Sequence, residues 1–255
     1  MILLLGGTSE AGAIAAALAA AGVRVLVSAA TNLPSTAAAS PLVAVRAGAL
    51  DDEGLGALIE QAGARAVVDA THPYASAVTR NAQLAAARAG VPYLRYLRPA
   101  VLTGADGAVT AADHEAAAMR AFRSGRPVLL TIGTRNLAPY LAEARRTGVP
   151  VVARVLPAAQ SLRACWAAGL TREQVVAGQG PFTVEQNVEL IQRCKIGVLV
   201  TKDGGAAGGV PEKLQAARRE GCEVVVVARP AEAIEPGLVY TDVCALVGVC
   251  VRHGT

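Results

Sequence analysis

The first residues suited to chemistry form a glycine-rich turn. Gly6, Gly7, Thr8, Ser9 and Glu10 follow a run of leucines and precede an alanine-rich stretch. Glycines let the backbone approach a diphosphate, hydroxyls cap helices or donate hydrogen bonds, and first-turn amides attract anions. The turn therefore predicts a nucleotide phosphate site, with a ligand-free strand-to-helix turn as the alternative. It matches neither the G-x-G-x-x-G pattern nor the P-loop.

A dinucleotide site also needs a group that holds the adenosine ribose, usually a carboxylate about 20 residues after the glycines. Residues 28–32 occupy that place and contain no acid. Ser28 and Asn32 would then belong to a small polar pocket for the ribose or its 2′-phosphate. The alternative is an ordinary polar loop after a strand.

Polar residues also end the apolar run at 66–70. Asp69 and Thr71 can fix a loop and contribute to the cofactor site, and His72 and Tyr74 can contact the nicotinamide or the substrate. His72 and Tyr74 are also candidates for acid–base catalysis. In the structural alternative, Asp69 and His72 satisfy backbone groups around Pro73.

Three turns in the second half follow apolar runs in the same way, and each offers glycine-freed amides plus a hydroxyl or a cation. They predict an anion-binding surface for the substrate, although any one of them can be a helix cap alone. The predicted substrate-binding residues are Thr134, Arg135, Gly180, Pro181, Phe182, Thr183, Lys202, Asp203, Gly204 and Gly205. Lys202 is also a third catalytic candidate. Further cations that can meet carboxylates are Arg80, Arg95, Arg98 and Arg154. Each of them, taken alone, is better explained as a solvated surface charge.

The elements that position these turns alternate between short β-branched or leucine-rich runs and alanine-rich helical stretches. This pattern predicts an α/β protein with two Rossmann-like domains, mostly parallel sheets and an interdomain cleft. We expect a cofactor-binding domain over 1–100 and a substrate-binding domain over 101–255, with 101–113 as the connection. Strands are expected near 1–5, 23–28, 42–46, 66–70, 92–97, 128–132, 151–156, 175–177, 198–201 and 223–228. The composition of 204–209 favours a mobile loop.

Composition excludes several classes of function. The five cysteines form no C-x-x-C pair and the three histidines are scattered, so we expect reduced thiols and no metal site. Dispersed charge of net +4 and 3% aromatic residues argue against nucleic acid. No apolar run is long enough for a membrane span, and the start lacks a signal peptide's basic region, so we expect a cytoplasmic protein without a membrane partner. A nucleophile constellation is also missing, which disfavours hydrolysis.

Together the motifs resemble the precorrin-6A reductase family of cobalamin biosynthesis. The resemblance rests on the segments 6–11, 68–75, 91–99, 180–182 and 200–205, in the family's order across most of the chain. It implies a two-domain Rossmann-like oxidoreductase that acts on a CH–CH group. A reduced nicotinamide cofactor would saturate one double bond of precorrin-6A or cobalt-precorrin-6A, a polycarboxylate macrocycle. The oligomeric state would be a monomer or a small homo-oligomer.

Two departures from the family pattern bear on the ligands. Family members often carry Ser-Leu-Ala-Gly-Arg after the second strand, and the loss of that arginine leaves NADH possible beside the expected NADPH. Gly204 stands where a serine is common, which removes one possible substrate hydrogen bond. Two other classes remain open: a non-catalytic dinucleotide-sensing module, and a cofactor-free enzyme that transforms tetrapyrroles.

Overall fold

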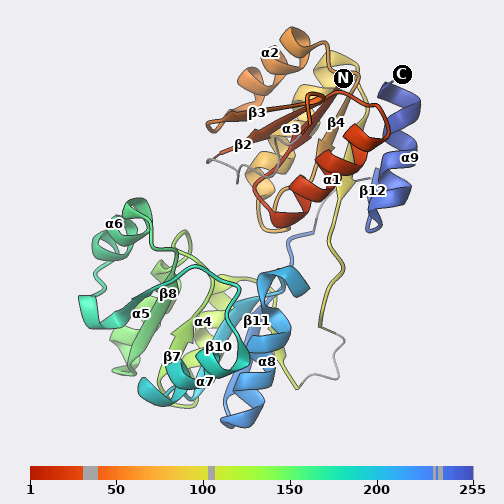
Figure 1. Ribbon diagram of the computed structural model, residues 1–255. Helices are drawn as coiled ribbons and strands as arrows, with labels where there is room; N and C mark the ends of the chain where they lie inside the picture. Colours follow the sequence, from red (N-terminus) through yellow and green to blue (C-terminus); the bar gives the residue numbers. More distant parts are fainter. Residues whose placement is uncertain (31–39, 103–106, 232–233, 235–237, 255) are drawn as a thin grey trace. The chain divides into compact units, whose positions relative to one another are not determined.

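The computed structural model describes residues 1–30, 40–102, 107–231, 234 and 238–254. The chain forms two compact units, which we treat separately (Figure 1). Unit 1 comprises Met1–Arg98 together with Pro230–Thr255, and unit 2 comprises Pro99–Arg229.

The centre of unit 1 is a six-stranded parallel sheet in the order β12-β5-β4-β1-β2-β3. Its strands are β1 (Ile2–Leu5), β2 (Val25–Ala29), β3 (Val43–Ala47), β4 (Ala66–Asp69), β5 (Tyr93–Tyr96) and β12 (Val239–Tyr240). β1, β4 and β5 are buried along their whole length, as expected of inner strands covered on both faces.

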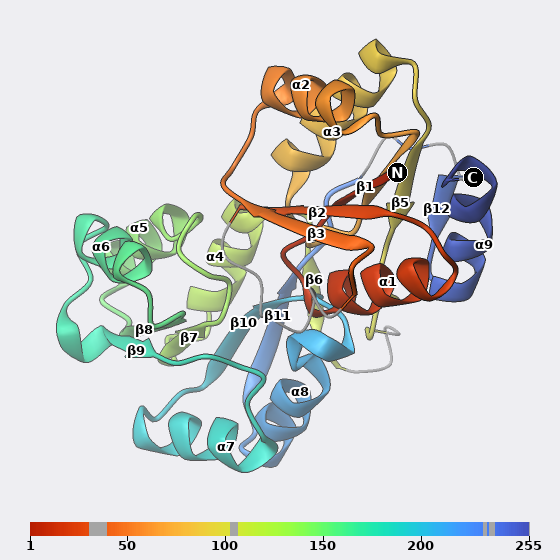
Figure 2. The same cartoon turned by 45° about the horizontal axis from the view of Figure 1, so that its top comes forward.

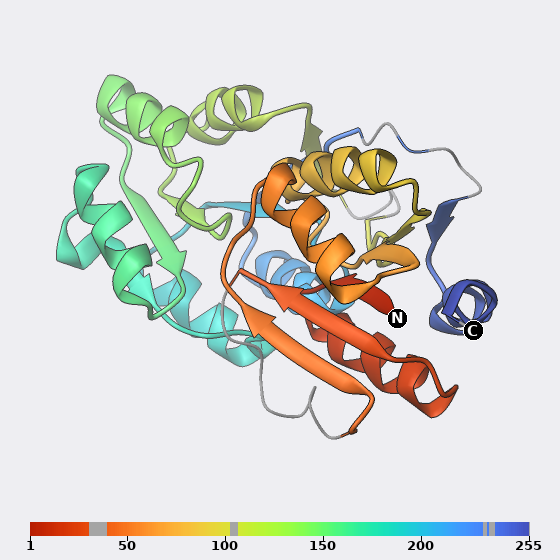
Figure 3. The same ribbon diagram turned by 90° about the horizontal axis from the view of Figure 1, so that it is seen from above.

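Helices cover both faces of this sheet. On one face, α1 (Ser9–Ala20) packs against α9 (Val243–Gly254). On the other, α2 (Asp52–Ala62) lies beside α3 (Ser76–Ala89), as the view from above shows (Figure 3). Local signals set the ends of α2, because the Asp51 side chain accepts from the amide of Gly54 and Gly63 ends the helix in the left-handed conformation.

Unit 2 contains a second six-stranded parallel sheet in the order β6-β11-β10-β7-β8-β9. Its strands are β6 (Val109–Ala111), β7 (Val128–Leu130), β8 (Val151–Val155), β9 (Val175–Ala177), β10 (Val198–Lys202) and β11 (Glu223–Val227). Its helices are α4 (His114–Phe122), α5 (Ala138–Thr147), α6 (Ala159–Ala167), α7 (Val184–Arg193) and α8 (Val210–Arg219), with single 3-10 turns at Arg172–Gln174 and Ala206–Gly208. α7 and α8 lie side by side on one face of the sheet, and α4 packs on α5 (Figure 2).

The sixth strand of each sheet comes from an unexpected part of the chain. β7 to β11 occupy the first five places of the Rossmann order, and β6, which precedes them, takes the sixth. In unit 1 the sixth place is taken by β12, which lies more than 140 residues after β5 in the chain and pairs with it through Val239 and Tyr240. The two edge strands are thus exchanged relative to two consecutive Rossmann domains.

This exchange corrects two predictions. The connection expected over 101–113 contains β6, and residues 230–255, expected in the second domain, belong to unit 1. β6 has three residues and β12 two, too short for an alternating pattern to reveal. The ten predicted strands are present, and the α/β class with two parallel sheets is confirmed. The predicted interdomain cleft stays a prediction.

Two further findings concern the described residues. Gly204 and Gly205, expected in a mobile loop, are buried and lead into the 3-10 turn Ala206–Gly208. Within this part of the chain, no helix combines the length and apolar character needed to cross a membrane.

Candidate functional site

The first candidate site lies where the strand order of unit 1 reverses, between β1 and β4. Ligands of open α/β sheets bind at the carboxyl ends of the strands at such a point. The hydroxyl of Thr8, just after β1, donates to the carbonyl of Ala70, just after β4, at 2.9 Å. The amide of Gly6 donates to the carbonyl of Ser28 at 2.8 Å. Three strand ends are therefore joined directly around the glycine turn.

The glycine turn leaves room for a ligand. Gly7 is exposed, has φ +119°, and a Cβ at this position would meet nothing within 4 Å. Thr8 is the N-cap of α1 but its side chain does not cap the helix, because the hydroxyl is bound to Ala70. The first amides of α1 therefore lack a side-chain acceptor, which suits an anion. Glu10 is held by Arg98 at 2.6 Å and by the Ser9 hydroxyl at 3.0 Å.

Asp69 supports the neighbouring turn from below. Its carboxylate accepts from the Thr71 amide at 2.9 Å, the hydroxyls of Thr79 and Tyr93 at 2.8 Å each, and Arg95 at 3.1 Å. The side chains of Asp69 and Arg95 are both 0% exposed. Asp69 was expected to contribute to the cofactor site; its fully buried side chain orders the turn, and a contact with the cofactor stays a prediction. Arg95 is buried in the same network.

The turn that Asp69 supports has polar atoms that remain available at the site. The Thr71 hydroxyl is buried and finds no hydrogen-bond partner within the described ranges. The Tyr74 amide donates to Nδ1 of His72 at 3.3 Å, which directs the proton of a neutral imidazole to Nε2. The rings of His72 and Tyr74 lie 5.5 Å apart. The turn thus presents an unsatisfied hydroxyl beside two partly buried groups capable of acid–base chemistry.

At the expected ribose position, Ser28 is buried and accepts a hydrogen bond from Arg46 at 2.9 Å. Arg46 comes from the end of β3 and is not among the residues predicted from the sequence. The one sequence feature that marks Arg46 is its position as a cation at the end of the third strand. Its relevance to the site follows only from the position of β3 beside β2. Asn32 lies outside the described residues.

The corresponding edge of unit 2 gathers several cations where β7 and β10 are neighbours. Exposed Arg135 follows β7, and Lys202 is the last residue of β10. Burial, and secondarily the charge of Arg135, lower the pKa of Lys202. His114, which the sequence analysis missed, lies 2.9 Å from the Tyr140 hydroxyl through Nδ1, and its pKa is lowered by burial and then by Lys202.

The Gly180–Thr183 turn reaches across this edge. Phe182 lies over the guanidinium of Arg154 at 4.1 Å, and Pro181 lies against Gly209 at the start of α8. Thr183 caps α7 through the amide of Gln186 and forms a capping box with it. The side chain of Thr183 therefore has the capping role that the sequence analysis left open.

The charged forms of two cations beneath this turn, buried Arg154 and half-buried Lys213, are disfavoured by their surroundings. Arg154 is 7% exposed; Nη1 donates to Asn187 at 2.8 Å, whereas Nη2 has no partner among the described residues. Burial lowers the pKa of Arg154 to about 10. Burial, and then the charge of Arg154, lower the pKa of Lys213 to about 8, and its ammonium group donates to the Gly208 carbonyl at 3.0 Å. A bound anion would relieve both groups.

Asp203 was expected to bind substrate, and this stays a prediction. It is 5% exposed and accepts from the amides of Val101 and Gly205 at 3.1 Å each. Arg229 donates to the Asp203 carboxylate at 3.3 Å and to its carbonyl at 3.0 Å. Asp203 therefore ties the first and last segments of unit 2 to the end of β10.

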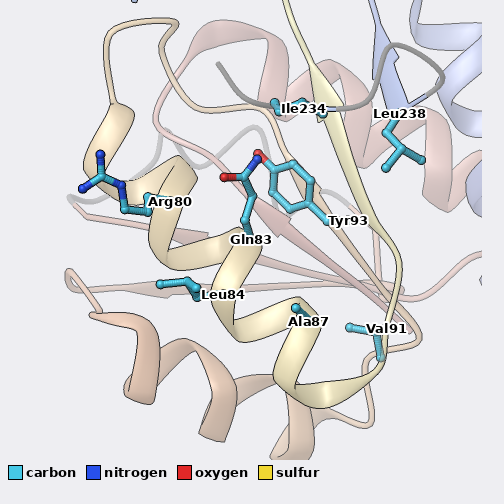
Figure 4. A pocket seen from close by; sticks show the side chains of 8 residues that line it. All are labelled: Arg80, Gln83, Leu84, Ala87, Val91, Tyr93, Ile234 and Leu238. Atoms are coloured by element: carbon cyan, nitrogen blue, oxygen red, sulfur yellow. The ribbon is translucent and has the colours of Figure 1, made fainter. Parts of the chain in front are cut away.

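A pocket of about 500 Å³ lies in unit 1, between α3 and the side chains of Ile234 and Leu238 (Figure 4). Arg80, Gln83, Leu84 and Ala87 of α3 line it together with Val91 and Tyr93. Of the cations selected from the sequence, it contains Arg80 alone. In the described part of the chain, no three His, Cys, Asp or Glu side chains converge as metal ligands, and the five cysteines are unpaired.

Comparison with known proteins shows the family and the fold. The family model described as precorrin-6x reductase CbiJ/CobK matches residues 1–250. The chain belongs to this family. The precorrin-6x reductase family therefore accounts for both units, and the family predicted from the sequence motifs is confirmed.

Individual members of the precorrin-6x reductase family agree. The chain is 34% identical to the cobalt-precorrin-6A reductase of Priestia megaterium, covering 94% of both chains. It is 35% identical to the precorrin-6A reductase of Rhodococcus erythropolis, covering 90% of this chain and 89% of the other. A solved structure named CobK precorrin-6A reductase superposes with a TM-score of 0.79 and 28% identity, covering 99% and 97% of the two chains. The predicted enzyme class, an oxidoreductase of cobalamin biosynthesis, is confirmed.

Proposed function

We propose that this protein reduces one double bond of the precorrin-6A macrocycle, with or without cobalt, using NADPH bound to unit 1. The observation that carries the proposal is the edge between β1 and β4, where an open glycine turn lies beside the unsatisfied hydroxyl of Thr71. The relatives carry the names of both the metal-free and the cobalt enzyme, so the proposed substrate is the macrocycle common to the two names.

The residues of unit 1 fit a dinucleotide. Gly7 and the uncapped first turn of α1 suit the diphosphate, and Ser28 lies one strand away at the ribose position. Thr71 and His72 would meet the nicotinamide. When bound, the cofactor would supply a hydride, and the residues around Thr71 and His72 would hold its nicotinamide ring in position for the transfer.

The residues of unit 2 fit a polycarboxylate. Arg154 and Lys213 are cations whose charged forms burial disfavours, and among the described residues neither forms an ion pair. Arg135 and Lys202 add two cations at the neighbouring strand ends. Carboxylates bound there would restore the stability of the charged forms, and the amides around Gly180 would add donors.

Reduction also requires a proton, and three side chains are candidates. Nε2 of His72 carries the proton of the neutral ring, and the Tyr74 hydroxyl lies on the same turn. The lowered pKa of Lys202 makes its ammonium group a better acid. His72→Gln, Tyr74→Phe and Lys202→Met are compared under single turnover; the variant that slows the step and removes one limb of its pH profile identifies the donor.

The function is tested by titrating the purified protein with NADPH and NADH while recording nicotinamide fluorescence. Turnover is then followed with precorrin-6A and with its cobalt form. We expect saturable cofactor binding and oxidation of the cofactor that requires the macrocycle. Binding without oxidation would favour a dinucleotide-sensing module, and failure to bind either dinucleotide would favour a cofactor-free enzyme. We place the reaction in the cytoplasm, with no nucleic acid or membrane partner.

A further inference from the structure

A small polar corner lies at the carboxyl ends of β1, β2 and β3. In the parallel register Leu5 is paired with Ser28, and Ser28 with Arg46. Nη1 of Arg46 donates to the Ser28 hydroxyl at 2.9 Å and to the carbonyl of Gly48 at 3.0 Å. Because the Gly6 amide is bound to the Ser28 carbonyl at 2.8 Å, the corner directly adjoins the glycine turn.

The backbone is shaped to admit the guanidinium group. Gly48 has φ +122°, and a Cβ there would lie 3.1 Å from Nη2 of Arg46. The Gly48 amide donates to the Ala29 carbonyl at 2.9 Å, which holds the end of β3 against the end of β2. A residue with a side chain at 48 would be strained and would displace Arg46.

The charge of the corner is uncompensated. Among the described residues, Arg46 forms no ion pair, and its acceptors are one hydroxyl and two backbone carbonyls, the second being Ala47 at 3.3 Å. β2 ends without the carboxylate that binds the ribose hydroxyls in NAD-dependent folds. An arginine at this place instead suits a phosphate, because its planar fork donates to two oxygens at once.

We propose that Arg46, positioned by Ser28 and Gly48, binds the 2′-phosphate of the adenosine ribose and selects NADPH over NADH. The inference rests on the proposed function, in which the diphosphate lies on the glycine turn. A dianionic phosphate competes well against neutral carbonyls for the guanidinium, whereas the hydroxyl of NADH leaves the charge unmatched.

The test uses calorimetric titration of the full-length protein with adenosine 2′,5′-bisphosphate and with 5′-AMP, which differ only in the 2′-phosphate, and with NADPH and NADH. The variants are Arg46→Ala and Arg46→Gln; the latter keeps an amide donor without the charge. Arg24→Ala is the matched control, because Arg24 is exposed and precedes β2 at the opposite end of the sheet. Circular dichroism establishes that each variant is folded.

We expect both Arg46 variants to weaken NADPH and bisphosphate binding roughly tenfold to hundredfold, the range for a charged hydrogen-bonded contact, with NADH changed less than about twofold. Salt should weaken wild-type binding of NADPH more than that of NADH. Unchanged NADPH preference in the Arg46 variants, or equal wild-type affinities for the two dinucleotides, would overturn the inference and leave the proposed function standing. Absence of binding by either dinucleotide would instead overturn the proposed function.

Discussion

At the scale of single residues, the side chains at the two sheet edges fall into two groups. Some hold the backbone of the site in place, and others are left to contact a ligand. Asp69 and Asp203 are buried and satisfied, so they hold backbone in place. Among the residues that the structure describes, the Thr71 hydroxyl and Nη2 of Arg154 are buried without partners. Because a buried polar group without a partner costs about 1–3 kcal/mol, we expect ligand atoms to bind at these two atoms.

Thr71→Val tests this interpretation in unit 1. Valine keeps the shape and removes only the unsatisfied hydroxyl, so the variant should be as stable as the wild type or slightly more stable. Its affinity for NADPH should fall about tenfold, the worth of one hydrogen bond. Fluorescence titration and thermal unfolding measure the two effects, with exposed Thr110→Val as the control. Unchanged affinity would remove Thr71 from the cofactor site.

His114 provides a pH prediction in unit 2. Burial and the nearby charge of Lys202 lower its pKa, so below about pH 6.5 the unfolded chain binds this proton more readily than the folded one. The contribution of His114 to the stability of the fold is therefore fully present above that pH, and it is lost as the pH falls toward the folded-state pKa. Proton NMR should show the His114 C2 resonance, assigned with His114→Gln, titrating below 6.5. A midpoint at or above 6.5 would contradict the burial argument.

At the scale of elements, the Asp69–Arg95 pair joins β4, β5 and α3. Nη1 of Arg95 also donates to the carbonyls of Asp69 and Thr71 at 3.1 and 3.0 Å, so one guanidinium fixes the strand end and the turn beyond it. Thr79 brings the second turn of α3 into the same network. The position of Thr71 therefore depends on three elements that meet around one buried carboxylate.

We expect Asp69→Ala to lower the free energy of unfolding by about 3–5 kcal/mol, because it strands the buried charge of Arg95. The control is Asp52→Ala, whose 2.7 Å pair with 61%-exposed Arg88 is worth about 1 kcal/mol or less. Urea unfolding at pH 7.5 measures both, and Asp69→Asn serves if the alanine variant does not fold. Equal losses for the Asp69 and Asp52 variants would refute the role given to the network.

At the scale of the whole molecule, unit 1 is completed by the end of the chain. β12 covers the edge of β5, and α9 places Leu246 and Cys250, both 0% exposed, in the core against α1. An independent domain made of residues 1–98 would expose this apolar face and the β5 edge.

Truncation after Arg229 should therefore affect the two units differently. Hydrogen exchange followed by mass spectrometry should show loss of amide protection within residues 1–98, because α9 and β12 no longer cover their sheet. Residues 99–229 should keep their protection, since unit 2 contains its own six strands. The full-length protein is the reference, and native protection of 1–98 in the truncated chain would show that unit 1 does not need its last strand.

The sequence alone determined the local features: ten strands, the helices between most of them, and the turns that end the strands, because these depend on neighbouring residues and on apolar runs. Only the tertiary structure decided the exchange of β6 and β12, the burial of Asp69 and Asp203, and the pairing of Arg46 with Ser28, 18 positions apart. A carboxylate at a strand end has the same local pattern whether it faces a ligand or a buried arginine. Which of the two it meets is set by strands that pack beside it from distant parts of the chain.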